Sequence, residues 1–335
     1  MEFINLTPFA ADRLIVMDGM GCEMLLVLVK ATFSLDSGVP KLSEKQDAIV
    51  MADEYAGEPG GSSLRHAAET SLFKPAADVV VSGFAHTHRS RRTEALVVLE
   101  IGSLIQKAVL VRGDRVWEGL LGSRISSPQG FLALPLVYER AFGGTDTTTQ
   151  PPESWPDNPV GIGFRARKSK APLSGTRLPN LEDARRPITH PKDRPPSSCL
   201  GPVAPSWNPR PNYAGTYDAA WQRDRMPFPP ADFNPRFEHP VPVDQVLHGY
   251  FSGGEPIRLT NVRPEGGGYR FALPSIHPEV VVRVGGERQT PPVRCDTLAI
   301  DCEGQRLSLL CRAALKVHGR VAELEWIKVQ ERAFA

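Results

Sequence analysis

The chain has 335 residues, of which 41% are hydrophobic and 23% are charged, and its formal net charge is +1 at pH 7. A globular chain of this size buries enough apolar surface for one large domain or two ordinary ones. The near-zero net charge gives no general attraction to nucleic acid or to a membrane surface, and we expect neither as a partner. No apolar run in the sequence reaches the roughly 18 residues that a membrane-spanning helix needs.

The compartment is predicted from the N-terminus and from the cysteines. The N-terminus, MEFINLTPFAADR, lacks the basic start and the apolar core of a signal peptide, so a cytoplasmic location is expected. The cysteines are odd in number and share no CxxC spacing: Cys22, Cys199, Cys295, Cys302 and Cys311. Reduced thiols are therefore expected rather than a disulfide framework.

Strand patterns dominate residues 1–122, the first of three regions into which the sequence divides. Leu14–Met17 comes first and Glu23–Leu35 follows. The second stretch is apolar without interruption before it begins to alternate, which is typical of a strand buried on both faces. Further strand patterns, which we interpret as an antiparallel meander, lie at 78–86, 93–101, 104–111 and 115–120.

Strand patterns return in residues 243–335, the third region. They lie at 245–251, 256–261, 269–273, 280–284, 297–302, 306–317 and 321–328. The stretch QRLSLLCRAALKV (305–317) resembles EMLLVLVKATFSL (23–35) in pattern and length. This similarity suggests two related β regions on either side of an irregular middle.

Residues 123–242 form that middle region, and the stretch Leu200–Phe237 is its most distinctive part. Eight prolines in this stretch exclude a long helix or a central strand. Seven aromatic residues lie among the prolines, whereas disordered chains are poor in aromatics. We therefore expect an ordered irregular segment wrapped over the sheets, with Trp207 and Trp221 largely buried. Only Thr216–Arg225 has a helical pattern.

These patterns together predict a mainly β fold. We expect antiparallel sheets, sandwich-like in arrangement, with the long Pro- and aromatic-rich middle segment packed on them and few short helices. The three regions are expected to form one composite domain, because the middle region has too few regular elements to fold alone.

Charged and aromatic residues of the middle region are the candidates for a binding site. Gly161–Met226 holds twelve Arg or Lys against five Asp or Glu, which fits either solvated loops or an anionic partner. The candidate residues are Arg140, Asp146, Trp207, Arg210, Tyr213, Tyr217, Asp218, Asp232 and Arg236.

Each candidate also has a structural interpretation. Arg140 and Asp146 would pair across a sharp turn at Gly143-Gly144. Arg210 and Arg236 would pair internally with Asp218 or Asp232. Between these interpretations we expect Arg236 to be held internally and Arg210 to lie at an interface.

Sequence motifs for catalysis or metal binding are missing. There is no G-x-S-x-G elbow, P-loop, H-E-x-x-H or strand-led G-x-G-x-x-G. His86 and His88 would face the same side of a strand, but no nearby cysteine or carboxylate completes a zinc ligand set. We therefore expect no metal and no other cofactor.

Several blocks of the sequence together resemble a bacterial family catalogued as domain of unknown function 2169. In chain order these blocks are NLTPFAADRLIVMD, DEYAGEPG with SSLRH, KPAADVVVSGFAH, LPLVYERAFGGTD, NPVGIGF, LPNLED and GPVAPSWNPRPNYAGTYDAAWQRDRMPFPPADFNPRF. The resemblance runs from Asn5 to beyond Leu273. It implies an accessory role in type VI secretion, as an adaptor or chaperone that helps to load a toxic effector onto the spike of the contractile tail. The partners it implies are the effector, the spike or spike-tip protein and a further accessory protein.

Three functions are left open by the sequence. The first is a non-enzymatic binding module, which the resemblance implies and which a broad Trp-, Tyr- and Arg-rich surface would serve. The second is an enzyme with an unfamiliar active site within residues 138–236. The third is a structural component that travels with the spike.

Overall fold

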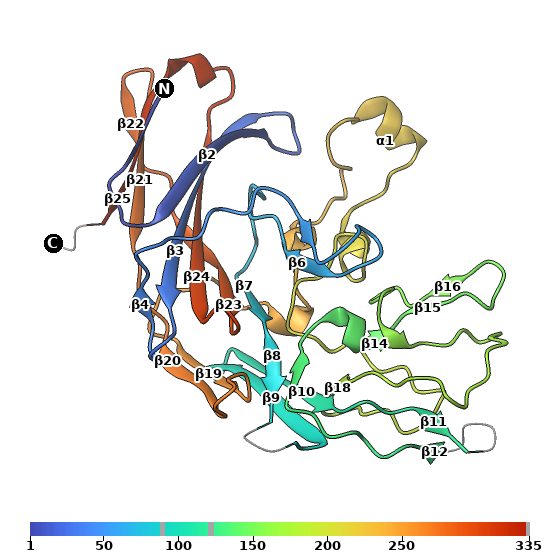
Figure 1. The fold of residues 1–335 in the computed structure, drawn as a ribbon. Coiled ribbons are helices and arrows are strands. Elements are labelled where there is room, and N and C mark those ends of the chain that lie inside the picture. The colour runs from blue at the N-terminus through green and yellow to red at the C-terminus, as the bar shows by residue number, and fades with distance from the viewer. Residues whose placement is uncertain (88–90, 120–123, 333–335) are drawn as a thin grey trace.

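The computed structural model of the protein describes residues 1–87, 91–119 and 124–332. Three larger sheets carry the fold (Figure 1), and the prediction of a mainly β protein is confirmed. The central sheet has the order β2-β3-β24-β23-β7, with β4 paired beside β3. Its strands are β2 (Ala10–Met17), β3 (Glu23–Ser34), β24 (Arg306–Lys316), β23 (Arg294–Asp301), β7 (Asp78–Ser82) and β4 (Lys41–Leu42).

Two further sheets complete the main frame. A five-stranded antiparallel sheet contains, in order, β18 (Leu181–Asp183), β10 (Ile105–Arg112), β9 (Glu94–Ile101), β19 (Pro256–Thr260) and β20 (Gly268–Ala272). A four-stranded sheet contains, in order, β1 (Glu2–Asn5), β25 (Leu324–Glu331), β21 (Pro278–Val284) and β22 (Glu287–Gln289). Most neighbouring strands are antiparallel, but β1 runs parallel to β25, and β7 runs parallel to β23.

The remaining elements of the described residues are short. The two-stranded pairs are β5 (Glu54–Tyr55) with β6 (Leu64–His66), β8 (Phe84–His86) with β13 (Ala133–Pro135), β11 (Trp117–Glu118) with β12 (Arg124–Ile125), β14 (Phe142–Gly143) with β17 (Ile162–Gly163), and β15 (Thr145–Asp146) with β16 (Glu153–Ser154). The described α-helix is α1 (Ala219–Asp224), and the 3-10 turns are η2 (Tyr138–Arg140), η3 (Arg210–Tyr213), η4 (Pro235–Glu238), η5 (Val243–Gln245) and η6 (Val321–Glu323).

Strand β3 is buried on both faces, as its uninterrupted apolar run predicts. Val27 and Val29 face a large core that also contains Val97 of β9 and Val282 of β21. On the opposite face, Leu28 packs in a smaller cluster with residues of β2 and β24. Each such buried side chain stabilises the fold by about 1.5–3 kcal/mol. The longest uninterrupted apolar run of the sequence, Met24–Val29, thus lies on a strand inside the central sheet.

The two stretches that resemble each other in sequence are direct neighbours in space. Residues 24–34 of β3 pair antiparallel with residues 306–316 of β24. Their similar pattern has a physical cause, because both strands occupy the middle of one sheet and both are buried on two faces. The first and last parts of the chain thus build the central sheet together.

Three local predictions are wrong. The expected meander keeps only β9 and β10 as neighbours, because the chain changes sheet at Gly83, where β7 ends and β8 begins. The expected strand 245–251 begins with the 3-10 turn η5 instead, since the Gln245 side chain donates to the carbonyl oxygens of Val79 and Leu200 at 2.7 and 2.9 Å. The stretch LPLVYERAFGGTD (134–146) also favours a short strand with Tyr138 and Arg140 on one face, but Tyr138–Arg140 is a 3-10 turn instead.

The turn that follows does require glycine. Gly143 and Gly144 have φ values of 152° and 110°. A Cβ atom at Gly143 would lie 2.1 Å from the carbonyl oxygen of Asn158, so a side chain cannot be accommodated without moving the backbone.

The middle region packs on the sheets as an ordered segment. Leu200, Val203 and Trp207 belong to the same core as the strands, and the Trp207 ring meets Tyr138 edge to face with 5.5 Å between centroids. A second, smaller core forms around Trp117 and Phe142 within residues 117–188. The division of the chain into three regions of one composite domain stays a prediction.

Candidate functional site

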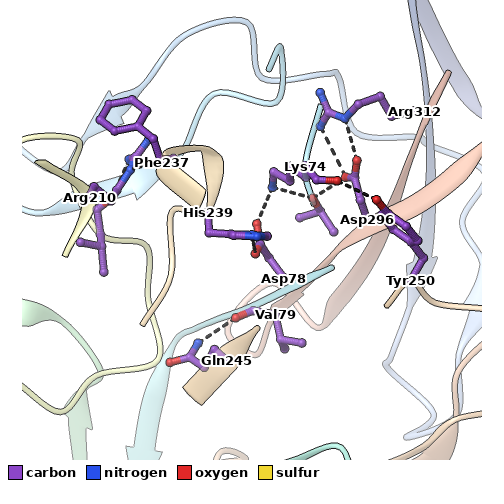
Figure 2. A network of polar contacts seen from close by, with 12 residues as sticks. Lys74, Asp78, Val79, Arg210, Phe237, His239, Gln245, Tyr250, Asp296 and Arg312 are labelled. Carbon is purple, nitrogen blue, oxygen red and sulfur yellow. Dashed lines mark hydrogen bonds and ion pairs between the residues drawn. The ribbon is translucent and has the colours of Figure 1, made fainter. Parts of the chain in front are cut away.

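A buried polar network fastens the middle region to the central sheet (Figure 2). Asp78 is fully buried at the start of β7. Its Oδ2 accepts from Lys74 Nζ at 2.5 Å, and its Oδ1 lies 2.5 Å from His239 Nδ1. Lys74 Nζ also donates to Thr297 Oγ1 at 2.9 Å. Lys74 and Asp78 are only four residues apart, but His239 and Thr297 come from distant parts of the sequence. These contacts therefore fix three segments relative to one another.

The network continues along β23 to β24. Thr297 Oγ1 donates to Asp296 Oδ1 at 2.9 Å, and Asp296 Oδ2 accepts from Arg312 Nε at 2.6 Å. Both Asp296 and Arg312 are buried. Buried charges are tolerated when they are paired and hydrogen bonded, as these are. We therefore attribute a structural role to this part of the network.

Arg210 anchors the middle region a short distance away. Its Nε donates to the Phe237 carbonyl oxygen and its Nη1 to the Val203 carbonyl oxygen, both at 2.9 Å. Its guanidinium carbon lies 4.9 Å from the centroid of the Phe237 ring, and the residue is only 7% exposed. Burial lowers the pKa of the guanidinium, against the opposing charges of Asp53 and Glu238.

The expected environments of Arg210 and Arg236 are reversed in the structure. Arg210, expected at an interface, is buried, since its N–H groups reach two carbonyl oxygens of the wrapped segment. Arg236, expected to be held internally, is exposed, and its guanidinium makes no hydrogen bond or ion pair with the described residues. Within the described chain, neither Asp218 nor Asp232 forms an ion pair with either arginine; both accept hydrogen bonds from nearby backbone N–H groups.

A cavity of about 390 Å³ lies beside Arg210. Its cationic and titratable lining residues are Arg210, Arg236, His239 and His248. Tyr213 also lines it, and its apolar wall includes Val241, Val243, Val246 and Leu247. The described lining residues include no carboxylate. Three of the nine candidate residues therefore meet at one cavity: Arg210, Tyr213 and Arg236.

Residues 215–233, which we call the arm, project from the body of the molecule and carry α1 (Figure 1). A hydrogen bond from Asn234 N to the Tyr213 carbonyl oxygen, at 2.9 Å, closes the base of the arm. Asp232 accepts from the backbone N–H and the hydroxyl of Thr216, and these bonds lower its pKa. Asp218 caps α1 by accepting from Trp221 N at 2.8 Å.

The arm rests on the loop between β2 and β3. Arg225 Nη2 donates to the Gly19 carbonyl oxygen at 2.7 Å, and the Phe228 ring lies directly against Gly21. Trp221 Nε1 donates to the Phe228 carbonyl oxygen at 2.8 Å. The Trp221 side chain has intermediate exposure, so its expected burial is met only in part. It packs on the arm itself rather than on the sheets.

Large apolar side chains are exposed on the arm and on the loop beneath it. Tyr217 is 58% exposed and Met226 is 60% exposed, while Met20 of the supporting loop is 77% exposed. The Tyr217 ring meets Trp221 nearly edge to face, with 4.6 Å between centroids. Tyrosine, tryptophan and methionine are enriched at protein–protein interfaces, and the arm presents all three.

Three candidate residues lie away from both the cavity and the arm. Trp207 is buried in the main core. Arg140 Nη1 donates to Asn180 Oδ1 at 2.9 Å and lies 3.5 Å from Asp114, so it does not pair with Asp146. Asp146 instead accepts hydrogen bonds from Thr148 and from the backbone N–H of Ala166.

The histidine and aspartate beside the cavity were not singled out from the sequence. Asp78 and His239 are 161 positions apart, and no local spacing links them. The one available signal is Asp78 at the edge of the apolar run DVVVS. A carboxylate buried there needs a partner to offset its desolvation. The sequence motif that did attract notice, His86-x-His88, is only half described: His86 lies on β8, and His88 lies outside the described residues.

Within the described ranges, no cluster of three or more His, Cys, Asp or Glu side chains is arranged to hold a metal ion. The five cysteines carry free thiols. No helix in the described part of the chain has the length and apolar character to cross a membrane.

Comparison with known proteins places the chain in a family. The family model described as "Uncharacterized protein conserved in bacteria (DUF2169)" matches residues 20–312. The chain belongs to this family. The DUF2169 match begins in the loop before β3 and ends within β24, so it includes the buried network, the cavity and the arm. No curated protein and no solved structure matches the chain.

Proposed function

We propose that this DUF2169 protein is a binding module of a bacterial type VI secretion system. It would hold a toxic effector in the cytoplasm and help to load it onto the spike complex before export. The motif resemblance described from the sequence supports this role, since it points to adaptors and chaperones of that system.

The exposed face of the arm is the observation that carries the proposal. The arm carries Tyr217, Trp221 and Met226. One hydrogen bond closes its base, and another joins it to the loop between β2 and β3. An aromatic anchor that is already ordered loses little conformational entropy when a partner covers it. A pre-ordered surface of this kind suits the recognition of a folded protein.

The polar candidates of the middle region also favour binding over chemistry. Asp218 and Asp232 order the arm, and Asp146 orders a turn. Arg140 joins the loops at Asn180 and Asp114. Each of these side chains has a structural role that accounts for it.

The arm can be tested by an affinity purification from the native host. The double variant Tyr217→Ser with Met226→Ser removes the exposed anchors and keeps the hydrogen bonds of the arm. We expect at least about a fivefold loss of co-purified effector and spike protein, because interface anchors each contribute about 1–2 kcal/mol or more. Leu104→Ser, at an exposed position on the β9–β10 loop, is the matched control. Unchanged recovery with an unchanged melting temperature would contradict the role of the arm.

One feature favours an enzyme as a second candidate. His239 lines the cavity, and its Nδ1 lies 2.5 Å from the buried carboxylate of Asp78. A carboxylate in this position orients an imidazole for general base catalysis. The variant His239→Gln distinguishes a binding module from an enzyme. An enzyme would lose its general base and its activity. A binding module that keeps its fold would still deliver the effector.

A further inference from the structure

The cavity at the base of the arm contains a buried positive charge without a paired negative one. The Arg210 side chain donates to two backbone carbonyl oxygens. Asp53 and Glu238 oppose its charge from beyond ion-pair distance, and no carboxylate of the described chain forms an ion pair with it. Backbone carbonyls solvate a guanidinium only in part, and a desolvated charge is costly unless it is compensated. An anion in the cavity would supply that compensation.

Further polar groups line the same cavity. The Arg236 guanidinium has no hydrogen-bond or ion-pair partner among the described residues. His239 Nε2 makes no hydrogen bond within the described chain, because the contact with Asp78 uses Nδ1. His248 is exposed at the edge. With no carboxylate among the described lining residues, the cavity attracts negative charge and repels positive charge.

The rest of the lining is apolar. Val241 and Leu247 are buried in the wall, and Val243 is 67% exposed at the rim. Pro75 and Pro209 add rigid apolar surface. The volume of about 390 Å³ is at the lower end of small-ligand sites and suits one apolar group with its charged end, not a nucleotide cofactor.

We propose that this cavity binds a carboxylate attached to an apolar group. Arg236 and Arg210 receive the carboxylate, and the valine and leucine wall receives the apolar group. Either a free small carboxylate or the C-terminal residue of a protein partner has this chemistry. The inference concerns the cavity alone and does not depend on the proposed role of the arm.

The proposal is tested with four probes in ligand-observed NMR and titration calorimetry on the full chain. The small probes are 4-phenylbutyrate and its uncharged analogue 4-phenylbutyramide. The peptide probes are Gly-Gly-Leu-Phe with a free C-terminal carboxylate and the same peptide as its C-terminal amide. Within each pair we expect the carboxylate to bind about tenfold more tightly, as for one charge-assisted contact. The pair with the higher affinity identifies the source of the ligand, a free acid or a chain end.

Variants connect the binding to this cavity. Arg236→Gln removes the exposed guanidinium and leaves the core intact. It should lower the affinity for the two carboxylate probes about tenfold and leave the affinity for the two amide probes unchanged. Val243→Ser should weaken all four probes to a similar extent, because it removes apolar wall. Arg270→Gln, on the exposed side of β20, is the matched control and should change nothing.

Three outcomes would overturn the proposal. One is equal affinity for a carboxylate and its amide. Another is carboxylate binding that Arg236→Gln does not alter. The third is the failure of both carboxylates to bind at about 5 mM, a concentration that detects even millimolar affinity.

Discussion

Asp78 joins side chains from two distant segments of the chain at one fully buried carboxylate. The variant Asp78→Asn keeps the size of the side chain and removes its charge. The Lys74 ammonium then stays buried without its counterion, since Thr297 Oγ1 is its other partner. Removing one partner of a buried ion pair costs about 3–5 kcal/mol. We expect a loss of this size in the free energy of unfolding measured with urea.

The control for this variant is Asp224→Asn. Asp224 forms an exposed ion pair with the neighbouring Arg223, at 2.7 Å, and water screens exposed pairs so that they contribute little to stability. If Asp78→Asn and Asp224→Asn are equally stable, the buried network does not fasten the middle region.

Asp146 makes stability depend on pH in the acid range. Its burial favours the neutral form, but hydrogen bonds from Ser169, Thr148 and the Ala166 backbone outweigh this and lower the pKa to about 2 from 3.8. A folded-state pKa below the unfolded value contributes stability above pH 3.8, and this stability is lost as pH falls through about 2. The carboxylate therefore stabilises the fold at neutral pH and not in strong acid.

The variant Asp146→Asn tests this dependence. At pH 7 it should be less stable than the wild type by roughly 1–2 kcal/mol, since solvent screening reduces the free energy that corresponds to the full pKa shift. The difference should shrink between pH 4 and pH 2 as the wild-type carboxyl takes up its proton. Urea unfolding of the wild type and the variant from pH 7 to pH 2 measures this difference in stability. A difference that stays constant with pH would show that the asparagine acts by packing and not by charge. Asp36→Asn, at an exposed position, serves as the reference.

At the scale of elements, two tryptophans of the same Pro-rich stretch have different environments. Trp207 is 2% exposed in the main core, whereas Trp221 packs on the arm and is half-buried. Trp207→Ala should cost about 3–5 kcal/mol because it leaves a large cavity. Trp221→Ala should cost only about 1–2 kcal/mol, from partial burial and one ring contact. Thermal unfolding of the two variants measures the contrast, and equal losses would mean that the arm is part of the cooperative core.

Long buried strands were predictable from sequence, and short irregular elements were not. β3 and β24 are 12 and 11 residues long and mostly buried, so a local apolar pattern extends over many residues in each. The stretch 245–251 also has a strand pattern, but the Gln245 side chain takes the place of strand pairing by donating to the carbonyl oxygens of Val79 and Leu200. Such long-range hydrogen bonds have no local signal.

The candidate site was only partly predictable, because its long-range contacts also have no local sequence signal. Composition drew attention to the middle region, and Arg210, Tyr213 and Arg236 do line one cavity. Residue type alone could not tell which arginine is buried, because that depends on where the Phe237 and Val203 carbonyl oxygens lie. His239 could not be found at all, since its partner Asp78 lies in another region.

At the scale of the whole molecule, the central sheet depends on both ends of the chain. β2, β3 and β7 come from residues before 83, and β23 and β24 come from residues after 293. A fragment of residues 1–242 therefore lacks the strands that cover β3, and we expect it to be unfolded. Co-expressed fragments 1–242 and 243–335 should associate, while the intact chain should unfold in a single transition. Circular dichroism and urea unfolding measure these outcomes, and a fragment 1–242 that folds cooperatively would contradict the composite domain.

The pairing of β3 with β24 also sets the order in which the protein forms during its synthesis. Residues 24–34 leave the ribosome long before residues 306–316, which are their neighbours in the sheet. At about 5–20 residues per second, the strand with the longest apolar run stays for tens of seconds without its partner. Closing so large a loop is slow, and an unpaired apolar strand invites aggregation in the meantime. The nascent chain is therefore expected to need protection by general cellular chaperones until residues 306–316 have been synthesised.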